Sequence, residues 1–354
     1  MFKKIAQGCF LVLTVLLTVT TANAHHSFAA TFKADAVISV EGIVTEFRFK
    51  NPHVLVYLDV TNEDGSVTQW VSEGSSATGK RRDGWDRNTI RVGQKVRITG
   101  DSTHDGSPMV SMEAVELLDA NSGAVVRTLG EEPEATSAEP LVTLPLKLKD
   151  GRPNLSGAWD RIRGGSRGGS PESLDGVPPF NAAGEAAQAA YNQADDPQIF
   201  CEPPGVVRQA GFTPHVVRIT QNDDHVVLEY EEYGGRRVVY FGDELPAAGV
   251  KSHLGDSIAR YEGDTLVIET RNLLSNPSHP WGYQTSDQVS TVEIYKRADD
   301  PQIGSILHAT MIVTDPGYLN EPWELIRERS YRDGYEFIEN DCRPPLRART
   351  VTKN

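Results

Sequence analysis

Apolar and polar residues alternate with a period of two along most of the chain, which is typical of β-strands rather than helices. In the first third, the alternating runs are rich in β-branched and aromatic residues, and turn pairs such as Asp64-Gly65 and Asp105-Gly106 separate them. The runs cover residues 37–49, 54–61, 67–73, 95–99 and 109–118. Five strands in this length predict a small barrel of the OB type over residues 25–120, and a five-stranded sandwich is the competing interpretation.

A second group of alternating runs fills the C-terminal part of the chain. It covers residues 215–220, 225–232, 236–241, 257–262, 265–270, 288–296, 306–314, 323–331 and 335–338. Candidate strands joined by short turns, without helices between them, predict an antiparallel up-and-down sheet that either closes or stacks. We expect a closed or nearly closed barrel over residues 154–354.

The region between the two groups reads differently. Residues 121–153 include an acidic, proline-bearing stretch with no period, and we interpret them as an extended linker. Residues 182–193 are rich in alanine and stop before Asp195-Asp196-Pro197, so they predict one short helix. The expected fold class is therefore all-β, with two barrels and one short helix between their strand groups.

The first 24 residues are typical of a secretory signal. Lys3 and Lys4 precede the apolar stretch 9–19, and Ala22-Asn23-Ala24 is a small-residue cleavage pattern. The apolar stretch is shorter than the about 20 residues that a membrane span needs. We therefore expect cleavage after Ala24, a periplasmic or secreted product and no stable membrane insertion.

The charge balance narrows the choice of partners. Cleavage would remove two of the 35 basic residues and none of the 49 acidic ones, which leaves a net charge of about −16. Nucleic acid and anionic membrane surfaces are therefore disfavoured as partners.

Two of the three cysteines, Cys201 and Cys342, would remain after processing. Two thiols in an oxidising compartment most simply form a disulfide. The alternative is a pair of buried free thiols, because their separation in sequence has no metal-ligand spacing.

Several motifs carry a resemblance to a family. The first piece comprises HHSFAATF at 25–32, EGIVTEFRFKNPHV at 41–54, Gly84-Trp85 and VGQKVRITG at 92–100. The second piece comprises DPQIFCEPPGVVR at 196–208, GDSIARYEGDTLVIET at 255–270 and DPGYLNEPW at 315–323. Together they resemble an uncharacterised family of exported bacterial proteins with two β domains, whose relatives carry histidine and tryptophan where this chain has Asp256 and Tyr261. Separately, Gly157-Ala158-Trp159 is similar to the Gly-x-Trp that opens the first strand of lipocalin-like barrels.

The His-His start of the expected mature chain is the most specific chemical feature. Cleavage before His25 frees an α-amine beside its imidazole, and His26 follows at once. With a third nitrogen from His53 in Asn51-Pro52-His53, such a set favours copper over other first-row divalent ions. His104 is the substitute for His53, and a solvated tail with His53 bonded to backbone is the alternative. Ser27 occupies the position where the tripeptide copper motif needs histidine.

In the C-terminal domain, two histidine-bearing loops flank one expected hairpin, and we expect both at one barrel mouth. The pairs His253 with Asp256 and His279 with Asp287 are candidates for proton transfer, which requires hydrogen-bond reach and a suitable pKa. No nucleophile elbow, P-loop, C-x-x-C or dinucleotide motif occurs, so no organic cofactor is expected.

Aromatic residues on the expected strands are candidates for lining a ligand site in the barrel, although aromatics on strands also form ordinary cores. The candidate ligand-binding residues are Tyr230, Arg236, Tyr240, Tyr261 and Trp281. Arg236 is followed by Arg237, and at most one of the two can point inward because neighbouring strand residues face opposite ways.

Three functions follow as hypotheses. The first is a periplasmic binding protein for a small, partly apolar molecule, with copper at the processed N-terminus. The second is an exported lyase, isomerase or hydrolase that acts at the barrel mouth without an organic cofactor. The third is a structural adaptor with a protein partner of unknown identity.

Overall fold

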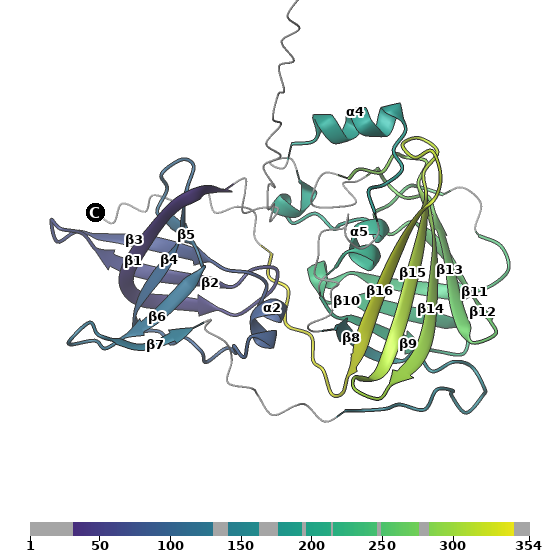
Figure 1. Cartoon of the computed structure of the whole chain (residues 1–354), viewed down its shortest axis with the longest axis horizontal. Coiled ribbons are helices and arrows are strands. Elements are labelled where there is room, and N and C mark those ends of the chain that lie inside the picture. The colour runs from purple at the N-terminus through teal and green to yellow at the C-terminus, as the bar shows by residue number, and fades with distance from the viewer. Residues whose placement is uncertain are drawn as a thin grey trace, which may run out of the picture.

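Two β-barrels lie side by side in the computed structural model, which describes residues 31–129, 141–162, 176–192, 196–213, 215–245, 249–275 and 283–342 (Figure 1). The predicted all-β class is confirmed. Within these ranges, the helices are all too short or too polar to cross a membrane.

The N-terminal barrel is built from five strands of a seven-stranded sheet. Its strands are β1 Phe32–Arg48, β2 Leu55–Thr61, β3 Val67–Glu73, β4 Lys95–Thr103, β5 Met109–Ser111, β6 Ala114–Leu118 and β7 Val125–Leu129. β1 pairs with both β2 and β4, and β5 pairs with β3 and β4, so the ring β1-β2-β3-β5-β4 closes on itself. The predicted small barrel is therefore confirmed over the sandwich alternative.

The end of this sheet departs from the prediction. Residues 109–118 form two strands rather than one, because β5 pairs with β3 while β6 pairs with β4. β4 and β5 approach closely at Gly100, where an added Cβ would lie 2.1 Å from the carbonyl oxygen of Ser111. β7 pairs with β6, so the sheet continues into the range that we expected to be linker.

The C-terminal barrel has nine strands and is closed. They are β8 Gly157–Arg161, β9 Val217–Gln221, β10 His225–Tyr230, β11 Arg236–Phe241, β12 Asp256–Glu262, β13 Thr265–Arg271, β14 Ser290–Asp300, β15 Gly304–Thr314 and β16 Trp323–Arg332. The ring runs β10-β11-β12-β13-β14-β15-β16-β8-β9 and is antiparallel except for the short parallel pair β11–β12. The fully antiparallel pattern expected from the sequence is therefore wrong at that one pair.

One predicted strand of this barrel is absent, and one observed strand was not predicted. Residues 335–338 form no strand, and β8 supplies the ninth. β8 pairs with β16 and β9, so no edge remains for a further strand. Gly157 opens β8 with a φ of +129°, and an added Cβ there would lie 2.4 Å from the ring of Tyr331.

The described helices are short: α2 Ala77–Arg82, α4 Ala182–Ala190, α5 Val206–Gly211, and the 3-10 turns η3 Pro197–Phe200 and η4 Glu232–Gly234. The predicted helix corresponds to α4, which begins at the N-cap Asn181 and ends where Tyr191 becomes extended. It lies between the two predicted strand groups, as expected, and follows β8 in the chain. Most residues of α5 are buried, and Val206 and Val207 share a core cluster with residues at the ends of β13, β15 and β16, so α5 packs at this end of the barrel.

Residues 335–342, called here the C-terminal strap, run between the two barrels (Figure 1). Asn51 of the N-terminal barrel forms a parallel bridge with Asn340, and the side chain of Ile338 packs against the N-terminal core. Cys342 forms a disulfide with Cys201, which confirms the expected pairing. The strap is thus bonded to one barrel and covalently joined to the other.

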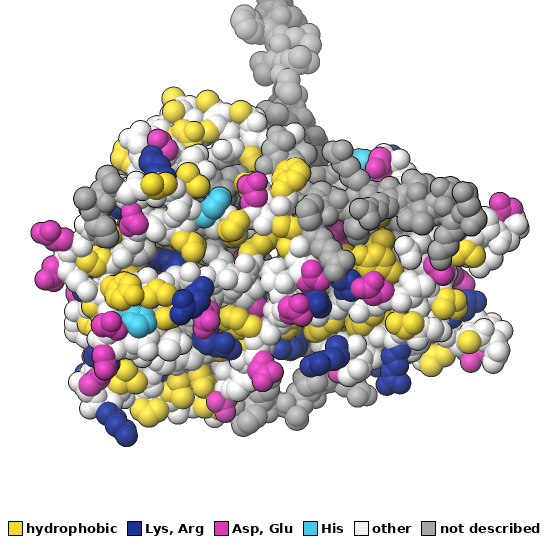
Figure 2. Space-filling view, turned by 180° about the vertical axis from the view of Figure 1, so that it is seen from behind, with side chains coloured by type: hydrophobic (Ala, Val, Ile, Leu, Met, Phe, Trp, Pro, Cys, Tyr) yellow, Lys and Arg dark blue, Asp and Glu magenta, His cyan; other side chains and the backbone are white. Residues whose placement is uncertain are grey.

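Acidic and basic side chains are interspersed over the face shown in Figure 2, on both barrels. This distribution agrees with an acidic protein that presents no uniform basic surface on that face.

Candidate functional site

The two barrels meet at a seam where Thr78, Glu231 and the C-terminal strap are in contact. The Asn51-Pro52-His53 turn lies at this seam. It follows β1, and its backbone is held by the C-terminal strap, because the Asn51 amide donates to Glu339 O (3.0 Å) and the Asp341 amide donates to Asn51 O (2.8 Å). The Asn51 side chain donates to Thr78 Oγ1 (3.0 Å) and is buried. The backbone that carries His53 is therefore fixed on both sides.

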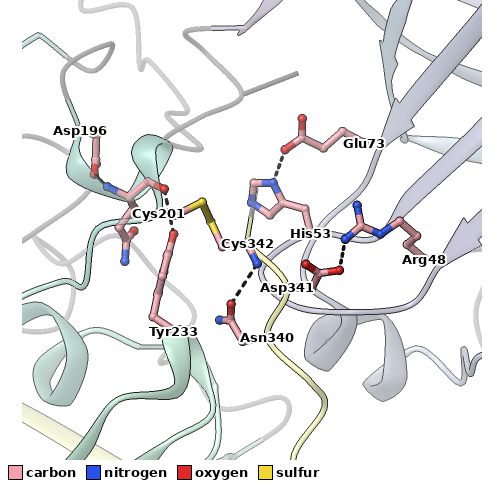
Figure 3. Close-up of a disulfide and its surroundings, with 10 residues drawn as sticks. Arg48, His53, Glu73, Asp196, Cys201, Tyr233, Asn340, Asp341 and Cys342 are labelled. Atoms are coloured by element: carbon pink, nitrogen blue, oxygen red, sulfur yellow. Dashed lines mark hydrogen bonds and ion pairs between the residues drawn. A yellow bond between two sulfur atoms is a disulfide. The ribbon is translucent and has the colours of Figure 1, made fainter. Parts of the chain in front are cut away.

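Glu73, at the end of β3, binds the ring of His53 through Nδ1 (Figure 3). The His53 side chain keeps 29% of its surface exposed, whereas Glu73 keeps 15%. Burial lowers the pKa of His53, but the attraction of the Glu73 carboxylate and its hydrogen bond outweigh burial and raise it overall. A carboxylate on one ring nitrogen is the arrangement that orients metal-binding histidines and sets their tautomer.

The start of β1 and the end of β3 that carries Glu73 belong to the same closed sheet. Thr31 O accepts from the His104 amide (3.1 Å), and Phe32 pairs with Thr103 of β4. From β4, β5 leads directly to β3, so the start of β1 is about three strand spacings, roughly 15 Å, from Glu73. The six residues 25–30 can span about 20 Å when extended.

His25 and His26 themselves lie outside the described residues. Among the residues that are described, no group of three or more His, Cys, Asp or Glu side chains is placed to hold a metal. A metal at His53 would therefore need ligands in addition to the described side chains.

A buried carboxylate that the sequence did not single out lies at the same seam. Glu231 accepts from Thr78 Oγ1 (2.8 Å), Tyr335 Oη (2.9 Å) and the Ile338 amide (2.8 Å). It therefore joins the N-terminal barrel, the C-terminal barrel and the strap. Glu231 is typical of a strand residue by sequence, and its partners are distant in sequence, so no local signal identifies it.

His215 is the second buried titratable group at the seam. Its ring lies 3.3 Å from Thr78 Oγ1. Burial lowers the pKa of His215, although the neighbouring carboxylates of Glu232 and Glu231 act in the opposite direction.

Of the two proposed catalytic pairs, His253 and Asp256 form no hydrogen bond with each other among the described side chains. His253 Nδ1 has no hydrogen-bond partner among the described residues, whereas Asp256 accepts from Asn272 (2.7 Å). Asp287 is exposed and pairs with Lys251 (2.8 Å), while His279 lies outside the described residues.

Among the described residues, the chain on either side of the hairpin β12–β13 meets at one end of the barrel, while residues 276–282 of the second loop lie outside them. Ser252 forms a bridge with Leu273, and Lys251 reaches Asp287. The residues before and after the hairpin β12–β13 therefore share the end of the barrel at which α5 packs.

The proposed ligand-binding residues are divided between the inside and the outside of the barrel. Tyr230 is buried and accepts from Arg237 Nη1 (3.1 Å), and burial raises its pKa to about 12. Tyr261 is half-buried and accepts from Gln221 (2.8 Å). Tyr240 is 60% exposed on the outer face. Trp281 lies outside the described residues.

Arg236 does not point into the barrel. Strand alternation turns it outward to solvent and turns Arg237 inward, where Arg237 forms a buried ion pair with Glu293 (2.8 Å). The inward arginine is therefore Arg237, and Arg236 contributes no interior ligand group.

Comparison with known proteins gives a match to one family model over part of the chain. Residues 14–111 match the model of a family of unknown function (DUF6152). The match contains the His25-His26 pair and the Asn51-Pro52-His53 turn, and it extends to the end of β5. No curated protein matches the sequence.

Proposed function

We propose that this is an exported protein that binds one copper ion at the seam between its barrels. The ligands are the α-amine and imidazole of His25 and the imidazole of His53, with His26 beside them. The observation that carries the proposal is the Glu73 carboxylate on Nδ1 of His53.

The chemistry follows from the donor atoms. Because Nδ1 of His53 is hydrogen-bonded to the Glu73 carboxylate, Nε2 is the nitrogen of His53 that would bind the ion. An amine and two imidazoles form a nitrogen-rich set, and copper is the divalent ion with the highest affinity for such sites. The negative charge of Glu73 increases the basicity of the ligating imidazole.

The location supports binding rather than a purely structural role for this turn. His53 remains partly exposed, and its backbone is clamped by the strap. A ligand on a rigid turn loses little conformational entropy when the ion binds.

The enzyme and adaptor hypotheses remain predictions. His253 and Asp256 form no hydrogen bond with each other among the described side chains, and Asp287 pairs with Lys251.

The test begins with the full precursor, from which the exported form is purified. Its N-terminal residue and intact mass are determined, and the protein is titrated with Cu²⁺ while binding is followed by calorimetry and electron paramagnetic resonance. We expect a chain that starts at His25, binds one copper and shows nitrogen hyperfine coupling. A different N-terminus, or no saturable copper binding, would refute the proposal.

Matched variants then locate the ligands. His53→Ala should abolish tight binding, and Glu73→Gln should weaken it by about 10- to 100-fold because the orienting carboxylate is lost. His104→Ala should bind as the wild type does. If His104→Ala lost copper and His53→Ala kept it, the ligand set would be wrong.

A further inference from the structure

The two sides of the turn that carries His53 are held by different parts of the molecule. On the C-terminal side, the Val54 amide donates to Ser75 O (3.0 Å), and Val54 O accepts from the Gly74 amide (2.8 Å), so these bonds stay within the N-terminal barrel. On the N-terminal side, both backbone groups of Asn51 are bonded to the strap. The backbone of Asn51 therefore depends on a segment that arrives from the other barrel.

The noncovalent contacts at this end of the strap are incompletely satisfied. The ion pair of Lys50 with Glu339 has side chains that are 36% and 69% exposed, and such surface pairs contribute little. Arg48 pairs with Asp341 through Nη2, but Arg48 Nη1 and Asn340 Nδ2 are buried and donate no hydrogen bond within the described ranges. Buried donors without a partner offset part of the gain from docking the strap.

The disulfide lies beside these contacts. Asn340 forms a parallel bridge with Asn51, and two residues further along each segment come Cys342 and His53, which lie next to each other in Figure 3. Cys342 is bonded to Cys201, which ends the turn η3. The covalent bond therefore ties the strap to the other barrel segment at the level of the proposed copper ligand.

Both cysteines are half-buried, so the bond is not fully enclosed. Partly exposed disulfides are more open to exchange with thiols than enclosed ones. The bond that fixes the end of the strap is thus also a bond that a reductant can break.

We propose that the Cys201–Cys342 disulfide controls the copper affinity of the His53 site, so that the oxidised protein holds copper and a dithiol reductant promotes its release. This inference rests on the copper proposal, because it concerns the same ligand. Reduction frees the end of the strap, and Asn51 loses the two backbone bonds that fix the turn. The Asn51 side chain stays bonded to Thr78, so binding is weakened rather than abolished.

The redox step is a thiol–disulfide exchange. One thiolate of the dithiol attacks a sulfur of the Cys201–Cys342 bond, which breaks and leaves a mixed disulfide, and the second thiol of the reductant then displaces the protein. Two electrons and two protons pass to the two cysteines, and the dithiol becomes a disulfide. Copper that binds to the reduced protein must order the turn again, and ordering the backbone of one residue lowers an equilibrium constant by roughly tenfold.

The first test compares the oxidised wild type with Cys201→Ser/Cys342→Ser, which lacks the bond and has no thiols at these positions to react with copper. Both exported proteins are titrated with Cu²⁺ in competition with a chelator of known affinity. We expect the variant to bind one copper about tenfold more weakly. Equal affinities would overturn this inference and leave the copper proposal intact, whereas no saturable binding by the wild type would overturn both.

A control variant separates this effect from a general loss of stability. Arg237→Met removes the buried ion pair with Glu293 inside the C-terminal barrel and leaves the strap untouched. Its copper affinity should equal that of the wild type. If it lost as much affinity as the cysteine variant, the effect would come from stability, and the inference would be wrong.

A measurement on the wild type alone needs no substitution and no copper. Amide hydrogen exchange is recorded before and after reduction by a dithiol. Exchange should become faster at the Asn51 and Asp341 amides, which bond across the seam, whereas the Val54 amide should keep its rate because its partner lies in the same barrel. Unchanged exchange at Asn51 and Asp341 would show that the strap stays docked without the bond, and it would overturn the inference.

Discussion

Glu231 and His215 are two buried titratable side chains at the seam. The Glu231 carboxylate is surrounded by donors from both barrels and the strap, whereas His215 lies beside Thr78. A buried imidazole is stabilised in its neutral form.

The pH dependence of stability should show the contribution of His215. Its folded-state pKa is lowered, first by burial and further by Arg82 and His53, against the opposing effect of Glu232 and Glu231. The contribution of neutral His215 to the free energy of unfolding is therefore fully present above the unfolded pKa of about 6.5, and it is lost as the pH falls below that value. We expect the free energy of unfolding to fall less steeply between pH 7 and 5 in His215→Gln than in the wild type.

The difference in slope is at most about 1.4 kcal/mol per pH unit, the limit for one proton. It is measured by urea unfolding at several pH values. Comparison with the variant isolates His215 from His53, whose raised pKa gives a contribution of opposite sign that is lost as the pH rises. Parallel profiles for the two proteins would contradict the prediction.

At the scale of the element, β11 places two adjacent arginines on opposite faces of the same strand. Arg236 and Arg237 are adjacent, but the pleat sends the first to solvent and the second to the barrel interior. Only Arg237 meets Glu293 and Tyr230, which are both buried. The chemical role of each arginine is thus set by its place on the strand.

Replacing each arginine by methionine tests this division. Arg237→Met should lower the free energy of unfolding by about 3–5 kcal/mol, because Glu293 would be left as an uncompensated buried charge. Arg236→Met, the matched control, should change it by no more than about 0.5 kcal/mol. Similar effects in chemical denaturation of the two variants would show that the strand does not face as described.

The strap illustrates a second rule for elements. Residues 335–338 have a strand-like composition, but their backbone groups form hydrogen bonds with side chains instead of with a neighbouring strand. Tyr335 O accepts from Arg218 (2.7 Å), and the Ile338 amide donates to the Glu231 carboxylate (2.8 Å). A segment becomes a strand only where a sheet edge is available for pairing. Closure of the barrel by β8 removed that edge.

At the scale of the whole molecule, the disulfide between Cys201 and Cys342 connects the strap to the segment before α5. Arg48 pairs with Asp341 beside the disulfide (Figure 3). Lys50 lies 3.1 Å from Glu339, so the strap is also bound to the N-terminal barrel. A single covalent bond thus restrains both the seam and the chain that enters the barrel mouth.

Removal of that bond should destabilise the folded protein. The double variant Cys201→Ala/Cys342→Ala should lose about 2–4 kcal/mol of unfolding free energy, because the bond closes a loop of 141 residues in the unfolded chain. Denaturant unfolding of the variant and of the oxidised wild type provides the measurement. An unchanged midpoint would mean that the contacts of the strap suffice to hold the seam without the covalent bond.

The parts of the candidate site that could be predicted are those marked by residue type and spacing within one short segment. The Asn51-Pro52-His53 turn and the pair of cysteines were identified from residue type and spacing. Glu73, which binds His53, was not identified, because the two residues lie on different strands and meet only through the pairing of β2 with β3. Glu231 and Thr78 are separated by 153 positions, and nothing in either neighbourhood announces their contact.

By itself the sequence determined the class of structure and most strand positions. Alternation of apolar and polar residues is a local property, so β3 and β11 begin and end where the pattern predicts. Tertiary structure alone decided the parallel contact of β11 with β12, the replacement of residues 335–338 by β8, and the burial of Arg237 in place of Arg236. The physical reason is that closure, edge availability and burial depend on which segments meet in space, and no single segment of the chain encodes them.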